Sequence, residues 1–137
     1  MRALVLDAWA VMVWLKGQQP AADRMRAILE AASCRECKLS MSIVNLGEVF
    51  YLSVKARDLA YGRRVLETLH SRVMTISAHD ELVMLAATLK ARHPISYADG
   101  FAAATALLQE APLVTGDPEM KVMAAAEKSL QLEWIGR

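Results

Sequence analysis

Residues 2–7 read RALVLD, a short apolar stretch that ends at an acidic residue. A run of this length rich in Val and Leu is typical of a strand that is buried on both faces, as in parallel sheets. The next segment, from Ala8 to Lys16, is apolar on most faces and is followed by Gly17, which favours a helix that ends there. The stretch therefore predicts a strand and a helix with Asp7 at the carboxyl edge of the sheet between them.

The same alternation continues outward along the chain. Further strands are expected at 38–43, 73–76, 112–115 and 130–135, and the segments between them carry helical patterns. Strands that are separated by helices form a parallel sheet covered on both faces. We therefore expect an α/β fold with three layers, α/β/α, around a central, mainly parallel sheet of about five strands. No linker or repeat interrupts the pattern, so residues 1–137 are expected to form a single domain.

Polar residues mark the starts of several of these helices. Ser42 or Asn45 could cap the helix at 44–56, and Asp58 could cap the one that follows it. Ser96 is expected to begin the Ala-rich helix that runs to about Glu110.

The composition limits the classes of function. The net charge is +1, with 16 basic and 15 acidic side chains, so no global field attracts the protein to nucleic acid. No apolar run approaches the roughly 18 residues of a membrane span, and we expect a cytoplasmic protein. The hydrophobic fraction is 55% and mean hydropathy is +0.23, which favours a buried interface in an oligomer, most simply a homodimer, or with a partner.

The cysteines and histidines do not indicate a site of their own. Cys34 and Cys37 form a lone C-x-x-C pair, whereas a structural zinc site needs about four ligands, so reduced thiols are expected. His70, His79 and His93 fall at expected helix ends or surfaces, where capping or solvated roles are the simpler interpretation.

Four acids occupy positions that are unusual for solvated surface charges. Asp7 and Asp117 follow strands, while Glu48 and Asp99 lie in apolar helical segments with no basic residue within one turn. Acids are rarely buried without a partner, and convergence on a cation would satisfy all four. Carboxylate oxygens are the ligands that Mg²⁺ and Mn²⁺ prefer. Taken singly, Asp7, Asp99 and Asp117 could instead be helix caps, and Glu48 could pair with a distant Arg or Lys.

At these residues the sequence resembles the PIN domain, and in length and element order it looks like a VapC-type toxin. The resemblance covers nearly the whole chain. It is carried by Val5-Leu6-Asp7, by the segment from Ser42 to Glu48, by the helix that opens with Asp99 and by Val114-Thr115-Gly116-Asp117.

The resemblance implies a PIN-like fold and a metal-dependent ribonuclease that is the toxin of a toxin–antitoxin pair. Asp7, Glu48, Asp99 and Asp117 would hold one or two Mg²⁺ or Mn²⁺ ions, and Thr115 would orient a water or a carboxylate. Metal-activated water would hydrolyse an RNA phosphodiester bond.

The sequence departs from the family pattern at two places. Ala8 and Trp9 follow the first acid, where the family usually has a hydroxyl residue, and this loss puts the rate and metal affinity in doubt. Met120 stands where the family often has an aromatic side chain, and it can fill the same space.

Several surfaces are candidates for RNA or protein contacts. A basic cluster could follow RNA phosphates or contact an acidic antitoxin, although it could also be a plain solvated face. Trp9 and Trp14 could stack on bases or pack in the core. A small antitoxin could dock near the segment Phe50-Tyr51-Leu52. The basic cluster comprises Lys55, Arg57, Arg63, Arg64 and Arg72.

Three other classes of function are alternatives to this interpretation. A catalytically silent PIN-like module that binds RNA or a protein is the main alternative, and metal binding would distinguish it. A receiver-like phosphoacceptor needs adjacent acids near the first strand, and a haloacid-dehalogenase-type phosphatase needs a second acid two positions after the first. Asp7 has neither neighbour, since Ala8 and Trp9 follow it.

Overall fold

A computed structural model describes residues 1–137 and contains one five-stranded sheet in the order β3-β2-β1-β4-β5. Every strand pair is parallel, so the sheet is wholly parallel where the sequence predicted a mainly parallel one. The strands are β1 (Arg2–Leu6), β2 (Cys37–Ser42), β3 (Val73–Ile76), β4 (Leu113–Thr115) and β5 (Leu132–Trp134).

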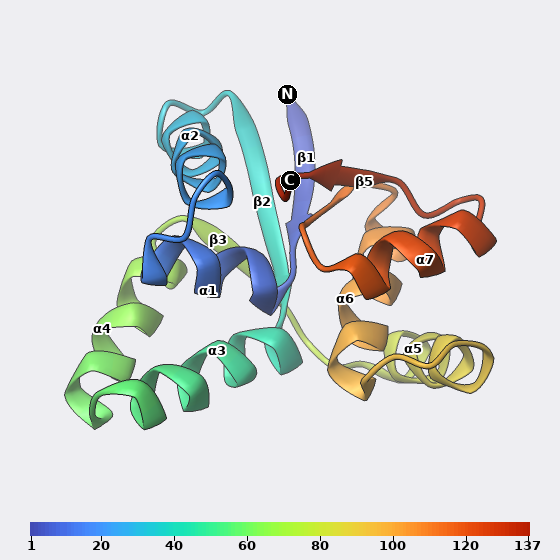
Figure 1. The fold of residues 1–137 in the computed structure, drawn as a ribbon. Helices are drawn as coiled ribbons and strands as arrows, with labels where there is room; N and C mark the ends of the chain where they lie inside the picture. The colour runs from blue at the N-terminus through green and yellow to red at the C-terminus, as the bar shows by residue number, and fades with distance from the viewer.

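Helices connect successive strands and cover both faces of the sheet (Figure 1). They are α1 (Ala8–Lys16), α2 (Ala21–Ser33), α3 (Ile43–Ala56), α4 (Leu59–His70), α5 (Asp80–Arg92), α6 (Tyr97–Gln109) and α7 (Pro118–Ala126). The predicted order of elements is confirmed throughout. None of these helices combines the length and the apolar character that a membrane crossing requires.

The two faces of β1 explain the three layers. Leu4 and Leu6 are buried in a core with residues of α1, α2, α3 and α4, whereas Val5 between them is buried in a second core with residues of α5, α6 and α7. Successive side chains of a strand point to opposite faces, so an unbroken apolar strand requires a helical layer on each side. The predicted α/β/α architecture is confirmed.

Small residues bring α5 and α6 close together on one of these faces. Gly100 in α6 lies so near α5 that a Cβ atom there would be 2.9 Å from the carbonyl oxygen of Ala86. The following residues of α6, from Phe101 to Ala106, are all buried. This close packing fixes the start of α6, where Asp99 lies.

The predicted boundary between the second strand and its helix was one residue too late. Ser42 ends β2 and caps α3, because its side chain accepts a hydrogen bond from the amide of Val44 at 3.2 Å. Asn45 is therefore not the cap and lies inside the helix. Asp58 caps α4 as predicted, by accepting from the amide of Tyr61.

Candidate metal centre

The centre of the sheet places two of the four acids side by side. β1 pairs with both β2 and β4, with Leu6 opposite Val114, so the direction of strand order reverses between β1 and β4. Crevices that bind ligands in open α/β sheets lie beyond the carboxyl ends of the strands at such a point. Asp7 directly follows β1, and Asp117 lies two residues beyond the end of β4.

Asp7 is both a helix cap and a buried carboxyl group with one unused oxygen. Its Oδ1 atom accepts a hydrogen bond from the amide of Ala10 at 2.8 Å, which caps α1. Its Oδ2 atom is buried and has no hydrogen-bond partner, and the residue is only 2% exposed. The capping alternative is therefore correct for one oxygen, while the other lacks a partner within the chain.

Asp117 caps α7 and is held by Thr115. Asp117 Oδ1 accepts from the amide of Glu119 at 3.0 Å. The amide of Asp117 donates to the Thr115 hydroxyl at 3.1 Å, and Thr115 is fully buried at the end of β4. This turn orients the Asp117 carboxylate at the sheet edge.

Asn45 links the helices that carry the other two acids. Its side-chain amide is buried and donates to the backbone carbonyl of Ala98 at 2.9 Å. Glu48 lies one turn further along α3, and Asp99 follows Ala98 in α6. Because this bond joins the two helices, it brings acids 51 positions apart in the sequence toward one site.

Asp99 is not a helix cap. Ser96 caps α6, and its hydroxyl accepts from the amide of Asp99 at 3.1 Å. The alternative that Asp99 caps its own helix is therefore wrong, and its carboxylate is free for another role.

The site also contains an acid that the sequence analysis missed. Ligand atoms of Asp99, Asp117 and Glu119 all lie within 4.8 Å of one another. Glu119 is in the first turn of α7, two residues after Asp117. The spacing Asp117-Pro118-Glu119 was the available signal, since a proline at the start of a helix fixes how its first turn leaves the strand.

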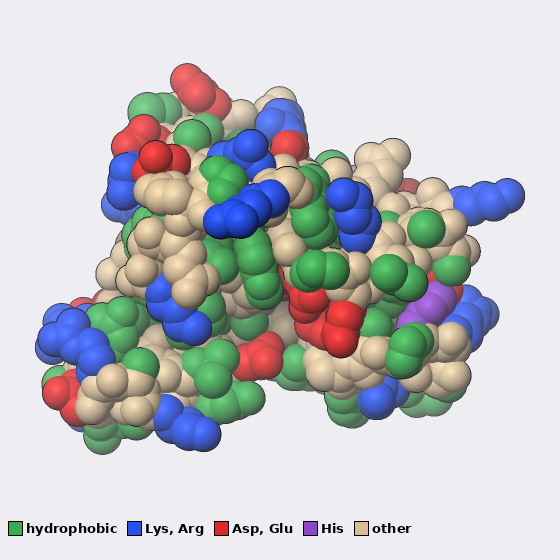
Figure 2. Space-filling view, in the orientation of Figure 1, with side chains coloured by type: hydrophobic (Ala, Val, Ile, Leu, Met, Phe, Trp, Pro, Cys, Tyr) green, Lys and Arg blue, Asp and Glu red, His purple; other side chains and the backbone are tan.

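A cavity of about 290 Å³ joins Glu48 to this cluster. Its lining includes Glu48, Asp99 and Asp117, together with Trp9 and the exposed Lys16. Figure 2 shows acidic side chains gathered in the hollow near the middle of this face of the molecule. Asp7 is not part of the cavity lining, but Asp99 and Asp117 are close enough for their charges to raise the pKa of Asp7.

Burial raises the pKa values of Asp7, Glu48 and Asp99, and the charges of neighbouring acids raise them further. Burial is the main cause that raises the pKa of Asp7 from its usual 3.8 to about 7, and the charges of Asp99 and Asp117 add to it, while the neighbouring Thr115 side chain and the Ala10 amide act in the opposite direction. Burial, and then the charge of Asp99, raises the pKa of Glu48.

The same two causes act on the remaining helical acid. Burial raises the pKa of Asp99, and the charges of Asp117 and Glu119 raise it further. Burial and neighbouring negative charge raise the pKa of a carboxyl group when no positive charge nearby compensates them. None of the ion pairs in the structure involves Asp7, Glu48, Asp99 or Asp117, so the alternative of a basic partner for Glu48 is not seen.

The donor set fits a hard divalent cation. All the candidate ligands are carboxylate oxygens, which suit Mg²⁺ and Mn²⁺. The buried Oδ2 of Asp7 lacks any partner, and an unsatisfied buried oxygen of this kind is a costly feature that a cation nearby would relieve. Lys16 lines the cavity mouth without forming an ion pair with these acids.

The aromatic and apolar residues singled out from the sequence have several roles. Trp9 and Trp14 both pack against the core, and Trp9 also lines the acidic cavity. Met120 is fully buried, as expected for a residue that fills space. Tyr51 is 51% exposed, whereas Leu52 lines the cavity.

The remaining candidates lie outside the acidic site. His79 caps α5 and His93 bonds to Glu127 at 2.9 Å, which confirms their helix-end roles. In the basic cluster, Arg57 lies over the ring of Tyr61. Cys37 is buried, and its burial raises the pKa of its thiol.

Comparison with solved structures gives the same fold. The chain resembles Rickettsia felis VapBC2 bound to a promoter DNA fragment, with a TM-score of 0.71 at 19% identity over 96% of this chain and 97% of that one. VapBC-1 from nontypeable Haemophilus influenzae matches with a TM-score of 0.67 at 20% identity, over 96% and 97% of the two chains. Mycobacterium tuberculosis VapC20, a toxin that cleaves the sarcin-ricin loop, matches with a TM-score of 0.71 at 13% identity, over 90% and 94%.

The sequence comparisons lead to one family. No curated protein matches the sequence. A family model described as the PIN domain matches residues 4–126, which include every acid of the site. The chain therefore belongs to the PIN domain family.

Proposed function

We propose that this chain is a metal-dependent endoribonuclease of the VapC type and acts as the toxin of a toxin–antitoxin pair. PIN-domain proteins are nucleases that generally depend on divalent metal ions. The observation that carries the proposal is the convergence of unpaired acids from four separate segments on one sheet edge, with a buried carboxylate oxygen that has no partner.

Asp7, Glu48, Asp99 and Asp117 would hold one or two Mg²⁺ or Mn²⁺ ions, and Glu119 is added to this set because of its distance from Asp99 and Asp117. A bound divalent cation would supply a water of lowered pKa, and positive charge near the phosphorus where that water displaces one ester oxygen. The chain must deliver Asp7, Glu48 and Asp99 in their ionised form, although burial and the charges of neighbouring acids raise their pKa values and favour protonation.

The residues around the acids position them. Thr115 accepts from the amide of Asp117 and so fixes the turn after β4, which supports the predicted orienting role. Asn45 joins α3 to the start of α6. Lys16, at the cavity mouth, provides a positive charge close to where an RNA phosphate would approach.

Two observations support an antitoxin partner. Several of the structures with this fold are VapBC complexes, and the surface carries exposed large apolar side chains. Tyr51 is 51% exposed and Leu59 is 46% exposed, at successive helices α3 and α4. We propose that an antitoxin segment covers this part of the surface.

Cleavage of end-labelled total RNA and transfer RNA, with Mn²⁺, Mg²⁺ or EDTA, tests the nuclease. The wild type should cut only with metal. Asp99→Asn should lower the rate by more than about a hundredfold, as expected when one preorganised electrostatic contact is removed. Glu67→Gln is the control, because Glu67 is an exposed acid on α4 that belongs to neither the acidic cluster nor the cavity lining. This variant should cut RNA as the wild type does.

The silent-module alternative rests on Ala8 and Trp9, since no hydroxyl follows the first acid and an indole occupies part of the cavity wall. The silent module would replace the nuclease proposal if neither the wild type nor Glu67→Gln cuts RNA and calorimetry detects no binding of Mn²⁺ to the wild type. Equal cutting by the wild type and Asp99→Asn would also reject the proposed site.

A further inference from the structure

A second cavity, of about 360 Å³, adjoins the acidic one. Trp9 contributes to the walls of both, and Gly116 and Pro118, which flank Asp117 in the chain, line the second. Cavities of about 300–1,000 Å³ that combine apolar surface with a few polar groups are typical of small-ligand sites. The acidic site therefore lies beside a pocket of a different chemical character, and the two share Trp9 as a wall.

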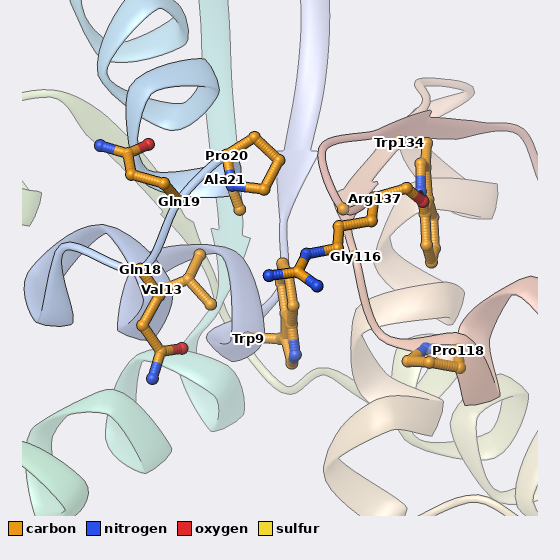
Figure 3. Close-up of a pocket in the computed structure, with 11 residues that line it drawn as sticks. Trp9, Val13, Gln18, Gln19, Pro20, Ala21, Gly116, Pro118, Trp134 and Arg137 are labelled. Carbon is orange, nitrogen blue, oxygen red and sulfur yellow. Dashed lines mark hydrogen bonds between the residues drawn. The ribbon is translucent and has the colours of Figure 1, made fainter.

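Two indole rings and two glycines form the walls of this pocket. At Gly116 a Cβ atom would lie 2.3 Å from Trp9 Cη2 and 2.9 Å from the amide nitrogen of Gly136. At Gly136 a Cβ atom would lie 3.0 Å from Trp134 Cζ2. Each indole therefore rests directly on backbone, and Figure 3 shows the two rings on opposite sides of the pocket with Arg137 between them.

The Trp134 ring is held in place by neighbouring groups. The Trp134 indole N–H donates to the Arg137 carbonyl at 3.1 Å, and the Lys121 ammonium lies 4.5 Å from the centre of the ring. The side chain of Arg24 donates to the carbonyl of Gly136, which anchors the segment after β5. A preorganised aromatic wall loses little conformational freedom when a ligand stacks on it.

The polar groups at the pocket mouth are suited to a nucleotide. The Gln19 amide is engaged with Asp23 as both donor and acceptor, but the exposed Gln18 amide has no such partner and can both donate and accept. Lys121 places a positive charge over the Trp134 ring. Flat π surface, one free amide and a nearby cation match the base, base edge and phosphate of single-stranded RNA.

We propose that this pocket, lined by Trp9, Trp134 and Gln18, binds one unpaired nucleobase next to the phosphodiester bond that is cut, and so selects the cleavage site. This inference rests on the proposed function, because its ligand is a nucleotide of the same RNA strand. The pocket would then select which RNA sequence is cut, while the acids carry out the cleavage. Stacking contributes most of the binding, and Gln18 contributes the discrimination between bases.

The test uses the four nucleoside 5′-monophosphates as probes, in EDTA, with the indole N–H signals of ¹⁵N-labelled protein as the readout. The signals of Trp9 and Trp134 should shift along one binding curve, while that of Trp14, which does not line the pocket, should stay still. Ribose 5-phosphate should cause no shift, because it has no base.

Trp134→Leu should weaken nucleotide binding, read from the Trp9 signal, by about 5- to 150-fold, the range expected for the loss of one base stack. Gln18 is exposed, so the Gln18→Ala variant should fold normally. It should reduce the differences in affinity among the four nucleotides. Trp14→Phe is the matched control and should bind as the wild type does.

Three results would overturn the inference: no shift with any nucleotide, equal shifts with ribose 5-phosphate, or an unchanged affinity in Trp134→Leu. The first is also the result expected if the pocket receives a peptide of a protein partner. Because the titration contains no metal, its outcome is independent of whether the protein cuts RNA. Failure of the nuclease proposal is read from the cleavage assay alone.

Discussion

The two oxygens of the Asp7 carboxyl group have different environments. One oxygen caps α1, and the other is buried without a partner, which raises the pKa of Asp7 to about 7. A carboxyl whose pKa is higher in the folded state than in the unfolded state favours folding at low pH. That contribution is complete below about pH 4 and is lost as the pH rises through 7.

Asp7→Asn should therefore raise the stability of the metal-free protein at pH 8 by up to about 4 kcal/mol, the equivalent of a shift of about three pKa units. Asn is as good a helix cap as Asp, so α1 should remain intact. Thermal unfolding in EDTA at pH 4.5 and pH 8 provides the measurement, and the gain should shrink toward the lower pH.

The matched control is Glu67→Gln, which removes an exposed acid and should show little dependence of its effect on pH. A gain in Asp7→Asn that is equal at both pH values would mean that desolvation of the carboxylate is not its cause.

Glu119 is expected to contribute to metal binding. Its carboxylate lies within 4.8 Å of ligand atoms of Asp99 and Asp117, so Glu119→Gln should weaken binding of Mn²⁺ by about 10- to 100-fold, the effect typical of groups that support a metal site. Calorimetry at pH 8 measures the affinity. An affinity equal to that of the wild type would remove Glu119 from the site.

The contact between α5 and α6 determines where Asp99 lies, and it depends on a single glycine. A Cβ atom at Gly100 would be 2.9 Å from the backbone carbonyl of Ala86, and backbone cannot move aside as a flexible side chain can. Gly100→Ala should therefore lower the free energy of unfolding by about 1–3 kcal/mol, as overpacking does.

Gly47→Ala in α3 is the control for this prediction, because a Cβ atom there meets nothing within 4 Å. Alanine favours a helix over glycine, so this variant should gain about 0.5–1 kcal/mol. Urea denaturation of both variants measures the difference. Equal gains in the two variants would show that α5 and α6 are not in close contact.

At the scale of the whole molecule, exposed apolar side chains predict assembly. Met84 on α5 is 65% exposed and Val122 on α7 is 69% exposed, and neither belongs to the surface of α3 and α4 assigned to an antitoxin. Surfaces of this kind usually lie in interfaces, so we predict a homodimer in solution with twice the chain mass of 15.1 kDa. Light scattering coupled to size-exclusion chromatography measures the mass, and a monomer at every concentration would contradict the prediction.

The fold could be predicted almost completely because its signals are local. The run at 3–6 is apolar on both faces of a strand and is followed by a helical segment, and a strand followed by a helix occurs four times along the chain. The end of β2 was misplaced by one residue because Ser42 fits both the last position of a strand and the cap of a helix. Such a choice depends on hydrogen-bond geometry that no sequence pattern contains.

The α/β/α architecture and the positions of four acids in its elements follow from the sequence alone, since strand ends and helix starts are set by neighbouring residues. Which of these groups meet depends on the tertiary packing. It brought Glu119 within 4.8 Å of Asp99 and Asp117, joined α3 to α6 through Asn45, and placed Trp134 on the same pocket as Trp9. These contacts join residues that are far apart in the chain, and their distances follow from the packing of helices on the sheet, which local sequence does not specify.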